Sequence, residues 1–287
     1  MCPPACATGC AHAFCADMPE LPEVEITRRG IEPHLLGKAL TGLIVRDRRL
    51  RWPVPAGLEG RLLGKRVRSV RRRAKYLLVD FDGGSLIIHL GMSGRLRIVS
   101  GEEAPQIHDH VDLSFGKTLL RLRDPRRFGS VLWQAGDAAK HRLLSHLGVE
   151  PLAGEFDGDY LYRATRARRV AIKQFLMNHA IVVGVGNIYA SEALFRSGIH
   201  PLTPAGRLSR ARCRELVQAV QETLQDALAA GGSTLRDFLN ADGNPGYFKQ
   251  QHLVYDRAGE PCRVCARPIR AIRQGQRSTF YCASCQR

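Results

Sequence analysis

MPELPEVE, residues 18–25, is the stretch that decides the fold. Pro22, Glu23 and Glu25 begin an amphipathic run that predicts a helix over residues 20–31, because proline suits a first helical turn and carboxylates favour the positive end of the helix dipole. If Pro19 is the first residue of the mature chain, it carries a secondary amine with a reference pKa of about 7.7 to 8. Such an amine can attack an aldehyde carbon and form an iminium. The stretch is therefore either a plain helix start or a helix start that presents a nucleophile.

The overall composition indicates a folded protein that binds a polyanion. The chain has 287 residues with 43 Lys and Arg against 27 Asp and Glu, a formal charge of +16, and 44% hydrophobic residues. This length is enough for two domains with their own cores, and this charge suits a nucleic acid, a ribosomal surface or an anionic membrane. A run of about eighteen apolar residues, as a membrane span requires, does not occur in the sequence.

The cysteines fall into two groups and one single residue. Four lie in the first seventeen residues: Cys2, Cys6, Cys10 and Cys15. We expect residues 1–18 to be an extension or a misassigned start, since an attached extension would turn the Pro19 amine into an amide. Cys213 lies in a helical pattern and is expected to be buried. The last four have the C-x2-C spacing, repeated after sixteen residues, of a structural zinc ribbon: Cys262, Cys265, Cys282 and Cys285. Two disulfides are the alternative, but no secretory signal precedes them.

Short apolar segments separated by turn signals follow the first helix. They predict an antiparallel β-sandwich or barrel for residues 19–150, with strands at Ala39–Val45, Arg66–Arg72, Tyr76–Phe81, Ser85–Leu90, Gly94–Val99, His110–Phe115, Thr118–Arg123 and Ser130–Trp133. Beyond the linker at Pro151, the apolar spacing becomes helical, with segments from Tyr160, Val170, Asn187 and Ser209. We therefore predict an α+β chain with a helical domain over 151–250 and a zinc ribbon over 251–287.

Two parts of the first domain carry residue types that suit DNA. The run Lys65–Lys75 is strongly basic, and phosphate contact is favoured there over a solvated strand edge. HLGMSGRLR contains His89 and Met92 at a glycine-flanked turn, and DPRRFG contains Arg126 and Phe128. Alone, Met92 and Phe128 would be assigned to the core. An enzyme that extrudes a base, however, needs an apolar wedge and a donor fork, and these loops supply both.

The glycine turn VGVGN, residues 183–187, runs into a helix. With Asn187 as the N-cap, its backbone N–H groups would face outward at the positive helix end and could bind one phosphate. A nucleotide fold is disfavoured because the spacing is not GxGxxG and the preceding segment is helical.

These strings together resemble the formamidopyrimidine-DNA glycosylases over residues 18–287. The resemblance rests on PELPEVE with TRRGIEPHLLGK, on RRRAKYLLVDF, HLGMSGRLR and DPRRFG, on VVGVGNIYASEALF, and on GQRSTFYC with the four cysteines. It implies a helix–two-turns–helix motif in the second domain. It also implies a bifunctional glycosylase and abasic-site lyase that removes oxidised purines from duplex DNA, with one structural zinc ion and no organic cofactor.

The resemblance also implies roles for single residues. Pro19 would attack C1′ of the flipped nucleotide and form an iminium that permits β- and δ-elimination, Glu20 would be the general acid, and Glu23 would hold water or the amine. Lys75 would hold phosphate near the reacting sugar. The DNA contacts would be His89, Met92, Arg126, Phe128, Lys173, Asn187 and Arg277. The glycine-rich stretch 231–247 would be a flap that covers 8-oxoguanine; a plain surface loop is the alternative.

Two other functions remain as alternatives. An endonuclease VIII-like enzyme would use the same amine on oxidised pyrimidines, but PELPEV and the complete DPRRFG turn argue against it. A nonenzymatic zinc-ribbon DNA-binding protein would explain the charge and the cysteines if Pro19 were blocked. For the favoured function we expect a monomer that binds damaged double-stranded DNA and no membrane, in the bacterial cytoplasm with the nucleoid DNA.

Overall fold

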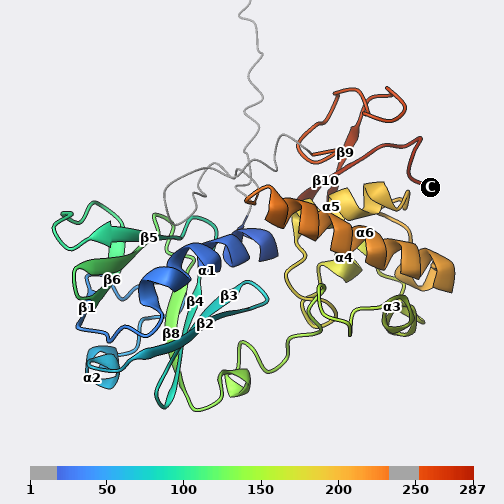
Figure 1. Cartoon of the computed structure of the whole chain (residues 1–287). Coiled ribbons are helices and arrows are strands. Elements are labelled where there is room, and N and C mark those ends of the chain that lie inside the picture. Colours follow the sequence, from blue (N-terminus) through green and yellow to red (C-terminus); the bar gives the residue numbers. More distant parts are fainter. Residues whose placement is uncertain (1–17, 233–251) are drawn as a thin grey trace, which may run out of the picture.

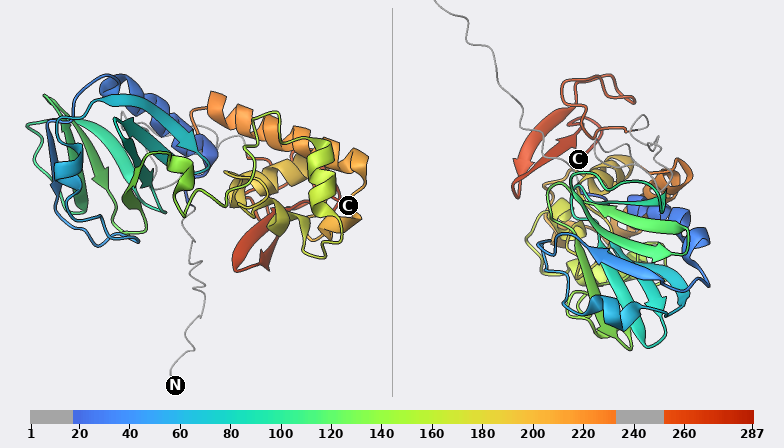
Figure 2. Two further views of the ribbon diagram at one scale, coloured as in Figure 1. Left: turned by 90° about the horizontal axis from the view of Figure 1, so that it is seen from below. Right: turned by 90° about the vertical axis from the view of Figure 1, so that its left-hand side faces the viewer.

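The computed structural model describes residues 18–232 and 252–287 (Figure 1). The stretch 231–247, expected to be a flap, lies mostly outside the described residues, as do the first seventeen residues. Within the described part, two bodies stand side by side, a β-rich one formed by the first half of the chain and a helical one formed by the second half (Figures 1 and 2). No helix in these two ranges has the length and apolarity to cross a membrane.

The first body is an antiparallel β-sandwich, as predicted. One sheet has the order β1-β6-β7-β5 and the other β2-β3-β4-β8. The strands are β1 (Gly42–Val45), β2 (Val67–Arg73), β3 (Tyr76–Phe81), β4 (Gly84–His89), β5 (Arg95–Ser100), β6 (Asp109–Phe115), β7 (Thr118–Arg123) and β8 (Ser130–Ala135). All these strands pair antiparallel, since short turns connect most of them.

Strand β4 is buried along nearly its whole length, and its centre is the apolar run of Leu86, Ile87 and Ile88. It lies between β3 and β8 in its sheet, and its two faces pack on different groups. Leu86 and Ile88 face the sandwich core, whereas Ile87 packs with Ala138 and Leu144 around the short helix η1 (Ala138–Lys140). The chain therefore covers both faces of its central strand.

Helix α1 (Leu21–Leu35) contributes to the cores of both bodies. Val24, Ile31 and Leu35 belong to the sandwich core. Leu21 belongs to the helical core instead, and its backbone N–H donates to Gly184 O at 3.1 Å. The helix continues past the predicted end at residue 31, because Ile31 and Leu35 are fully buried against the sheet. Helix α2 (Leu58–Leu62), which was not predicted, buries its first and last residues in the same core.

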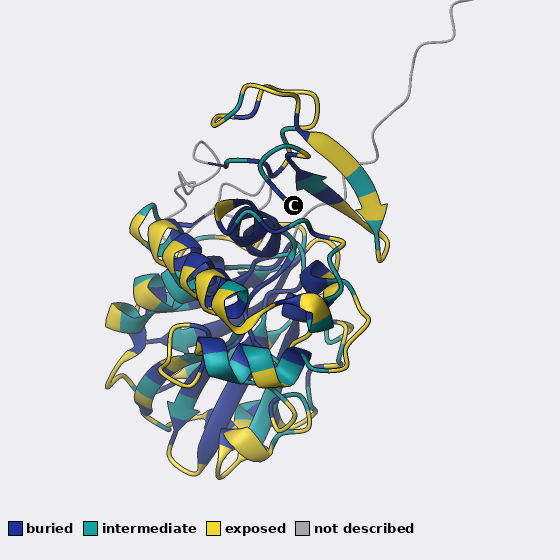
Figure 3. Cartoon of the chain, turned by 90° about the vertical axis from the view of Figure 1, so that its right-hand side faces the viewer, coloured by how far each residue is buried: buried dark blue, intermediate teal, exposed yellow. Residues whose placement is uncertain are grey.

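The second body packs helices around one core (Figure 3). Its elements are α3 (Gly158–Thr165), α4 (Ile172–Leu176), α5 (Asn187–Arg196), the short η2 (Ala205–Arg207) and α6 (Arg210–Ala229). Helix α6 begins where predicted, since the Ser209 hydroxyl accepts from Arg212 N. It packs on α3 and α5, burying Cys213 as expected.

The last part of the chain is a β-hairpin of β9 (Arg270–Gln274) and β10 (Arg277–Tyr281). Its two-residue turn, Gly275 and Gln276, has positive φ at both positions, as a tight hairpin turn of this kind requires. Phe195 of α5 packs with Val254 and Ile269 in the small core behind the hairpin. The hairpin is thereby attached to the helical body through α5.

Candidate active site and nucleic-acid interface

The carboxylate of Glu20 lies at the junction of the two bodies. It is 2% exposed and follows Pro19, which is also buried. Its two oxygens accept from Gly186 N at 2.6 Å and Ile188 N at 3.0 Å, at the first turn of α5. A carboxylate is favoured at this position, because unpaired N–H groups and the positive helix end meet there.

The glycine turn therefore differs from the expectation in two respects. The N-cap of α5 is Gly186, and Asn187 is the first helical residue. The N–H groups that we expected to face a phosphate are those that bind Glu20. A Cβ on Gly186 would lie 2.4 Å from the Glu20 carboxyl, and one on Gly184, whose φ is +79°, would lie 2.6 Å from the Leu21 side chain. The two glycines thus allow residues 20 and 21 to approach the turn.

Glu23 is held by two donors from opposite sides. Its Oε2 accepts from Glu20 N at 2.9 Å, and its Oε1 accepts from the Tyr189 hydroxyl at 2.6 Å. The side chain is fully buried. Because Tyr189 lies on α5, this carboxylate forms a second link between the chain start and the helical body.

Lys75 lies in the turn between β2 and β3, which Glu150 supports. Ala74, with a φ of +55°, donates its N–H to Glu150 Oε1 at 2.7 Å. In the basic run before Lys75, Arg66 donates to Gly37 O, and the other four arginines pair with carboxylates of the protein, which leaves less free charge for phosphate than we expected. The pairs are Arg68 with Asp82, Arg71 with Asp80, Arg72 with Glu25 and Glu150, and Arg73 with Glu150.

His89, at the end of β4, is held as a neutral imidazole. Its Nδ1 accepts from Gly91 N at 3.0 Å, which leaves the ring proton on Nε2. Desolvation by the surrounding side chains lowers the pKa of His89 to about 4, and the positive charges of Lys75 and Arg51 add to this. Arg51 was not among the predicted residues, although its position beside His89 puts another cation on this face.

Hydrogen bonds to one buried carboxylate join the loops that carry Met92 and Phe128. The buried Asp124 accepts from the Ser93 hydroxyl at 2.7 Å and from Gly129 N at 2.7 Å. Phe128 is 41% exposed, and Met92 is half-buried. An exposed phenylalanine over a rigid, hydrogen-bonded support suits a wedge better than a core position.

Arg126 belongs to the same arrangement. Its backbone N–H donates to the Ser93 hydroxyl at 3.1 Å, and its guanidinium carbon lies 5.0 Å from the centre of the Phe128 ring. The cation–π contact orders both exposed side chains. The structure thus brings together three of the predicted residues, Met92, Arg126 and Phe128, from two loops.

Lys173 is buried between three segments instead of facing solvent. It is 1% exposed, and its ammonium donates to Asn187 Oδ1 at 2.7 Å, Thr279 Oγ1 at 2.7 Å and Ser278 O at 3.2 Å. An ammonium has three donors, and three protein oxygens receive them. Lys173 thus joins α4, α5 and β10, and its contact with phosphate stays a prediction.

Asn187 is oriented by its neighbours. Its Oδ1 accepts from Lys173, and its Nδ2 donates to the Tyr255 hydroxyl at 3.2 Å. The side chain is half-buried. Arg277, at the start of β10, is exposed and lines a cleft of about 250 Å³ together with Lys173, Gln174 and Met177.

Glu192 is a positioning residue that the sequence did not reveal. This buried carboxylate of α5 accepts from the backbone N–H groups of Leu253, Val254 and Tyr255 at 2.8 to 3.0 Å. Burial raises the pKa of Glu192, and the three N–H donors oppose that rise. Glu192 fixes Tyr255, and Tyr255 in turn holds Asn187. A lone glutamate within a helical pattern gives no signal of such a role.

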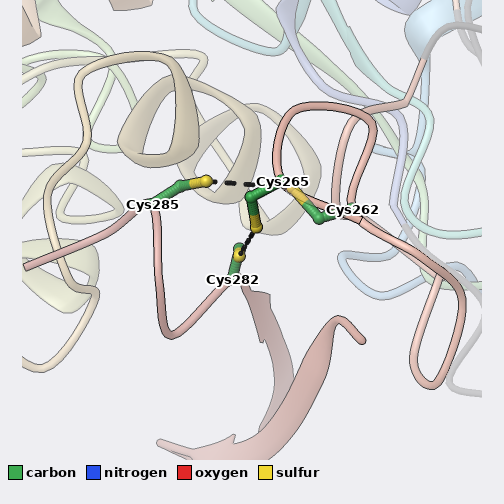
Figure 4. A group of neighbouring side chains, drawn as sticks. All are labelled: Cys262, Cys265, Cys282 and Cys285. Carbon is green, nitrogen blue, oxygen red and sulfur yellow. Dashed lines mark hydrogen bonds between the residues drawn. The ribbon is translucent and has the colours of Figure 1, made fainter. Parts of the chain in front are cut away.

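The four cysteines converge behind the hairpin (Figure 4). Their Sγ atoms all lie within 4.8 Å of one another, with Cys262 and Cys285 at 3.9 Å and Cys265 and Cys282 at 3.4 Å. A tetrahedral zinc ion with Zn–S bonds of about 2.3 Å has sulfur–sulfur edges of about 3.8 Å, so the cluster fits zinc. All four are free cysteines, which argues against the disulfide alternative. Four thiolates fill the coordination sphere and leave no open position for a substrate, so the role of the metal is structural.

The fold and the site define the class of helix–two-turns–helix DNA glycosylases. Three domain families match the chain: the formamidopyrimidine-DNA glycosylase N-terminal domain over 18–131, the formamidopyrimidine-DNA glycosylase H2TH domain over 147–239, and the zinc finger found in FPG and IleRS over 259–287. The chain belongs to the formamidopyrimidine-DNA glycosylase family, and its cysteine cluster binds one structural zinc ion.

Similar proteins cover nearly the whole chain. A formamidopyrimidine-DNA glycosylase from Aromatoleum aromaticum is 61% identical over 270 residues, which are 94% of this chain and 100% of that protein. A mutant Lactococcus lactis Fpg in complex with Fapy-dG containing DNA has a TM-score of 0.88 and 31% identity, over 94% and 100% of the two chains. A MutM protein in complex with carbocyclic 8-oxo-G containing DNA has a TM-score of 0.87 and 32% identity, with the same coverage.

Proposed function

We propose that this chain excises oxidised purines, 8-oxoguanine and formamidopyrimidines, from double-stranded DNA and then cleaves the resulting abasic site. The observation that carries the proposal is the hydrogen bonding of Glu20 to Gly186 and Ile188. It seats the carboxylate next to Pro19 against the first turn of the helix that carries Asn187. A nucleotide whose phosphate is held at Asn187 would thus have its sugar near the amine.

The reaction proceeds through covalent catalysis by the Pro19 amine, in a mature chain that begins at this residue. The nitrogen forms a bond to C1′ and loses its proton, and the base leaves with the electrons of the glycosidic bond. The sugar ring then opens, with Glu20 as the acid that protonates the ring oxygen. The resulting iminium draws electrons from the sugar, so that β- and then δ-elimination release the two phosphates.

The other predicted residues have distinct parts in this proposal. Met92 and Phe128 fill the space of the extruded base, and Arg126 faces its orphaned partner. Lys75, Arg277 and the His89 Nε2–H donate to phosphates. Lys173 acts through Asn187, which it orients, and Glu23 holds the start of the chain. The zinc ion holds the hairpin that carries Arg277, and no step of the chemistry passes through it.

The test is borohydride trapping on a duplex that contains 8-oxoguanine, followed by mass mapping of the crosslinked peptide. A crosslink on Pro19 supports the proposal, and a crosslink elsewhere or none on a chain that begins at Pro19 contradicts it. Glu20→Gln should abolish base removal while duplex binding remains, because the substitution removes an acid and keeps the shape. Excision at the unaltered rate would rule out the acid role of Glu20.

The domain boundaries and the location are part of the same proposal. We assign residues 19–150 to the catalytic domain, 151–250 to the helix–two-turns–helix domain and 251–287 to the zinc ribbon; the domain-family matches support these boundaries. The protein acts as a monomer in the bacterial cytoplasm, on nucleoid DNA. Fractionation of cells, with and without nuclease treatment of the nucleoid, tests the location.

A further inference from the structure

An exposed group of arginines lies on the helical body, outside the candidate site. Its members are Arg163, Arg168, Arg169 and Arg207, which we call the arginine surface. Within residues 18–232 and 252–287, none of their side chains has an ion pair or a hydrogen bond. This distinguishes them from the arginines of β2, which pair with carboxylates of the protein. Four guanidinium forks are therefore available to an external anion.

The arginine surface is built from three segments that the fold holds together. Arg163 lies on α3, Arg168 and Arg169 on the connection from α3 to α4, and Arg207 on η2. The two connections run side by side, because Gly206 N donates to Arg168 O and Ala205 N to Val170 O, both at 2.9 Å. The backbone thus fixes the spacing of the charges.

Two more arginines, Arg166 and Arg210, lie beside this surface, because both stack on the ring of Tyr162. The guanidinium carbons of Arg166 and Arg210 lie 3.9 and 5.0 Å from the centre of its ring. Arg166 is also anchored by bonds to the carbonyls of Tyr162 and Leu208. The nearby Asp159 neutralises part of this charge, since it pairs with Arg210 at 3.0 Å. The four members of the arginine surface keep their full charge.

The arginine surface is separate from the residues assigned to the lesion site. Arg277 lies on β10, and Figures 1 and 2 show α3 at the end of the helical body opposite to β9 and β10. Asn187 lies on α5, and its partners Lys173 and Tyr255 lie on α4 and in the segment that precedes the hairpin. A duplex held at the site would therefore meet the α3 end of the arginine surface only some distance from the lesion.

We propose that the arginine surface binds the phosphate backbone of duplex DNA outside the lesion site. The inference rests on the proposed function, because that function makes DNA the polyanion that this chain handles. Guanidiniums spread over three segments suit successive phosphates of a backbone. The phosphates belong either to the distal part of the damaged duplex or to a second duplex.

The experiment compares two variants that lose the same charge. One carries Arg163→Ser, Arg168→Ser, Arg169→Ser and Arg207→Ser. The control carries Arg29→Ser, Arg61→Ser, Arg66→Ser and Arg68→Ser, which are exposed arginines of α1, of α2, at the position before β2 and of β2. Affinity for an undamaged duplex of several helical turns is measured as a function of salt. Each lost phosphate contact lowers the slope of log K against log salt by about 0.9.

We expect the arginine-surface variant to lose about two or more units of slope on the long duplex, and the control to lose less than about one. Equal slopes for the two variants, or no change in either, overturn the proposal. Two further arms identify the source of the phosphates. A loss seen with the long duplex but not with one of about 10 base pairs indicates the same duplex. If two labelled short duplexes show energy transfer with the wild-type protein and lose it with the arginine-surface variant, the phosphates belong to a second duplex.

The proposed function is tested separately with the same proteins. Borohydride trapping and single-turnover excision on a short damaged duplex should be unaltered in the arginine-surface variant, since none of the four residues belongs to the lesion site. If the wild-type chain fails to form the crosslink, the proposed function fails. The salt slopes on undamaged DNA then still decide whether the arginine surface binds a duplex.

Discussion

The backbone N–H of Gly186 lies 2.6 Å from the Glu20 carboxylate, although 166 residues separate them in the chain. The bond joins the segment that carries Pro19, the proposed nucleophile, to the helix that carries Asn187. In the proposed function, the glycine turn therefore sets the position of the chemistry as well as that of the DNA. This relationship gives the first prediction.

Gly186→Ala should impair base excision strongly. A Cβ would lie 2.4 Å from the carboxyl carbon of Glu20, so the carboxylate must move. A displacement of about 1 Å in an active site costs on the order of 100-fold in rate. Single-turnover excision measures this, with duplex affinity as the reference. Gly154→Ala is the matched control, because a Cβ there meets no atom within 4 Å. Equal rates for the two variants would show that Glu20 need not stay on the turn.

The imidazole of His89 should titrate near pH 4 instead of 6.5. Because the pKa of His89 is lower in the folded state, between pH 4 and 6.5 its imidazole is protonated in the unfolded chain and neutral in the folded protein. The contribution of His89 to stability is complete above pH 6.5 and decreases as the pH falls to about 4, by at most about 3 kcal/mol. NMR titration of the ring gives the midpoint, and the difference in unfolding free energy between wild type and His89→Gln gives the linkage. A midpoint at 6.5 contradicts the prediction.

Tyr255→Phe should weaken DNA binding through Asn187. The substitution removes the hydroxyl that accepts from Asn187 Nδ2 and keeps the ring in its packing. We expect a loss of roughly 1 kcal/mol in duplex affinity, the usual net worth of one hydrogen bond. In a double-mutant cycle with Asn187→Ala, most of this loss should disappear. Additive losses would mean that Tyr255 does not act through Asn187.

Phe128→Ala should reduce excision from damaged duplex more than affinity for undamaged duplex. Phe128 is exposed, so the substitution leaves no cavity in the protein, and only the extruded state loses its wedge. Unstacking a base costs a few kcal/mol, and the wedge offsets part of that cost. The ratio of single-turnover excision rate to duplex affinity checks this. Leu202→Ala, at another exposed apolar residue, serves as the control.

Removal of zinc by a chelator should lower DNA affinity while the sandwich stays folded. The small core behind the hairpin contains two of the cysteines, Cys262 and Cys282, and would lose its framework with the metal. Arg277 would then lose its position. Circular dichroism and duplex binding during chelation follow the two effects, and re-addition of zinc should restore affinity. Full affinity of the metal-free chain would contradict the coupling.

The strands and the cysteine cluster could be predicted from the sequence, because turn signals and spacing are local. Residues 76–81 and 118–123, for example, are strands at the expected bounds. The contacts of Lys173 and Glu192 could not be predicted. Lys173 was assigned to phosphate, but the oxygens that accept from its ammonium belong to segments up to 106 residues away. Burial of a charged group depends on such distant partners, and no local pattern records them.

The placement of Leu21 in the helical core has a consequence for the order of synthesis. Pro19, the proposed nucleophile, is translated well before Gly184 and Gly186, which hold the neighbouring Leu21 and Glu20. The sandwich can fold early, while the contacts of Glu20 and Leu21 with the helical body form only later. A nascent chain stalled before residue 183 should therefore form no crosslink with abasic DNA, whereas the released protein should. The enzyme should thus become reactive toward DNA only after Gly186 has been translated and α5 has folded.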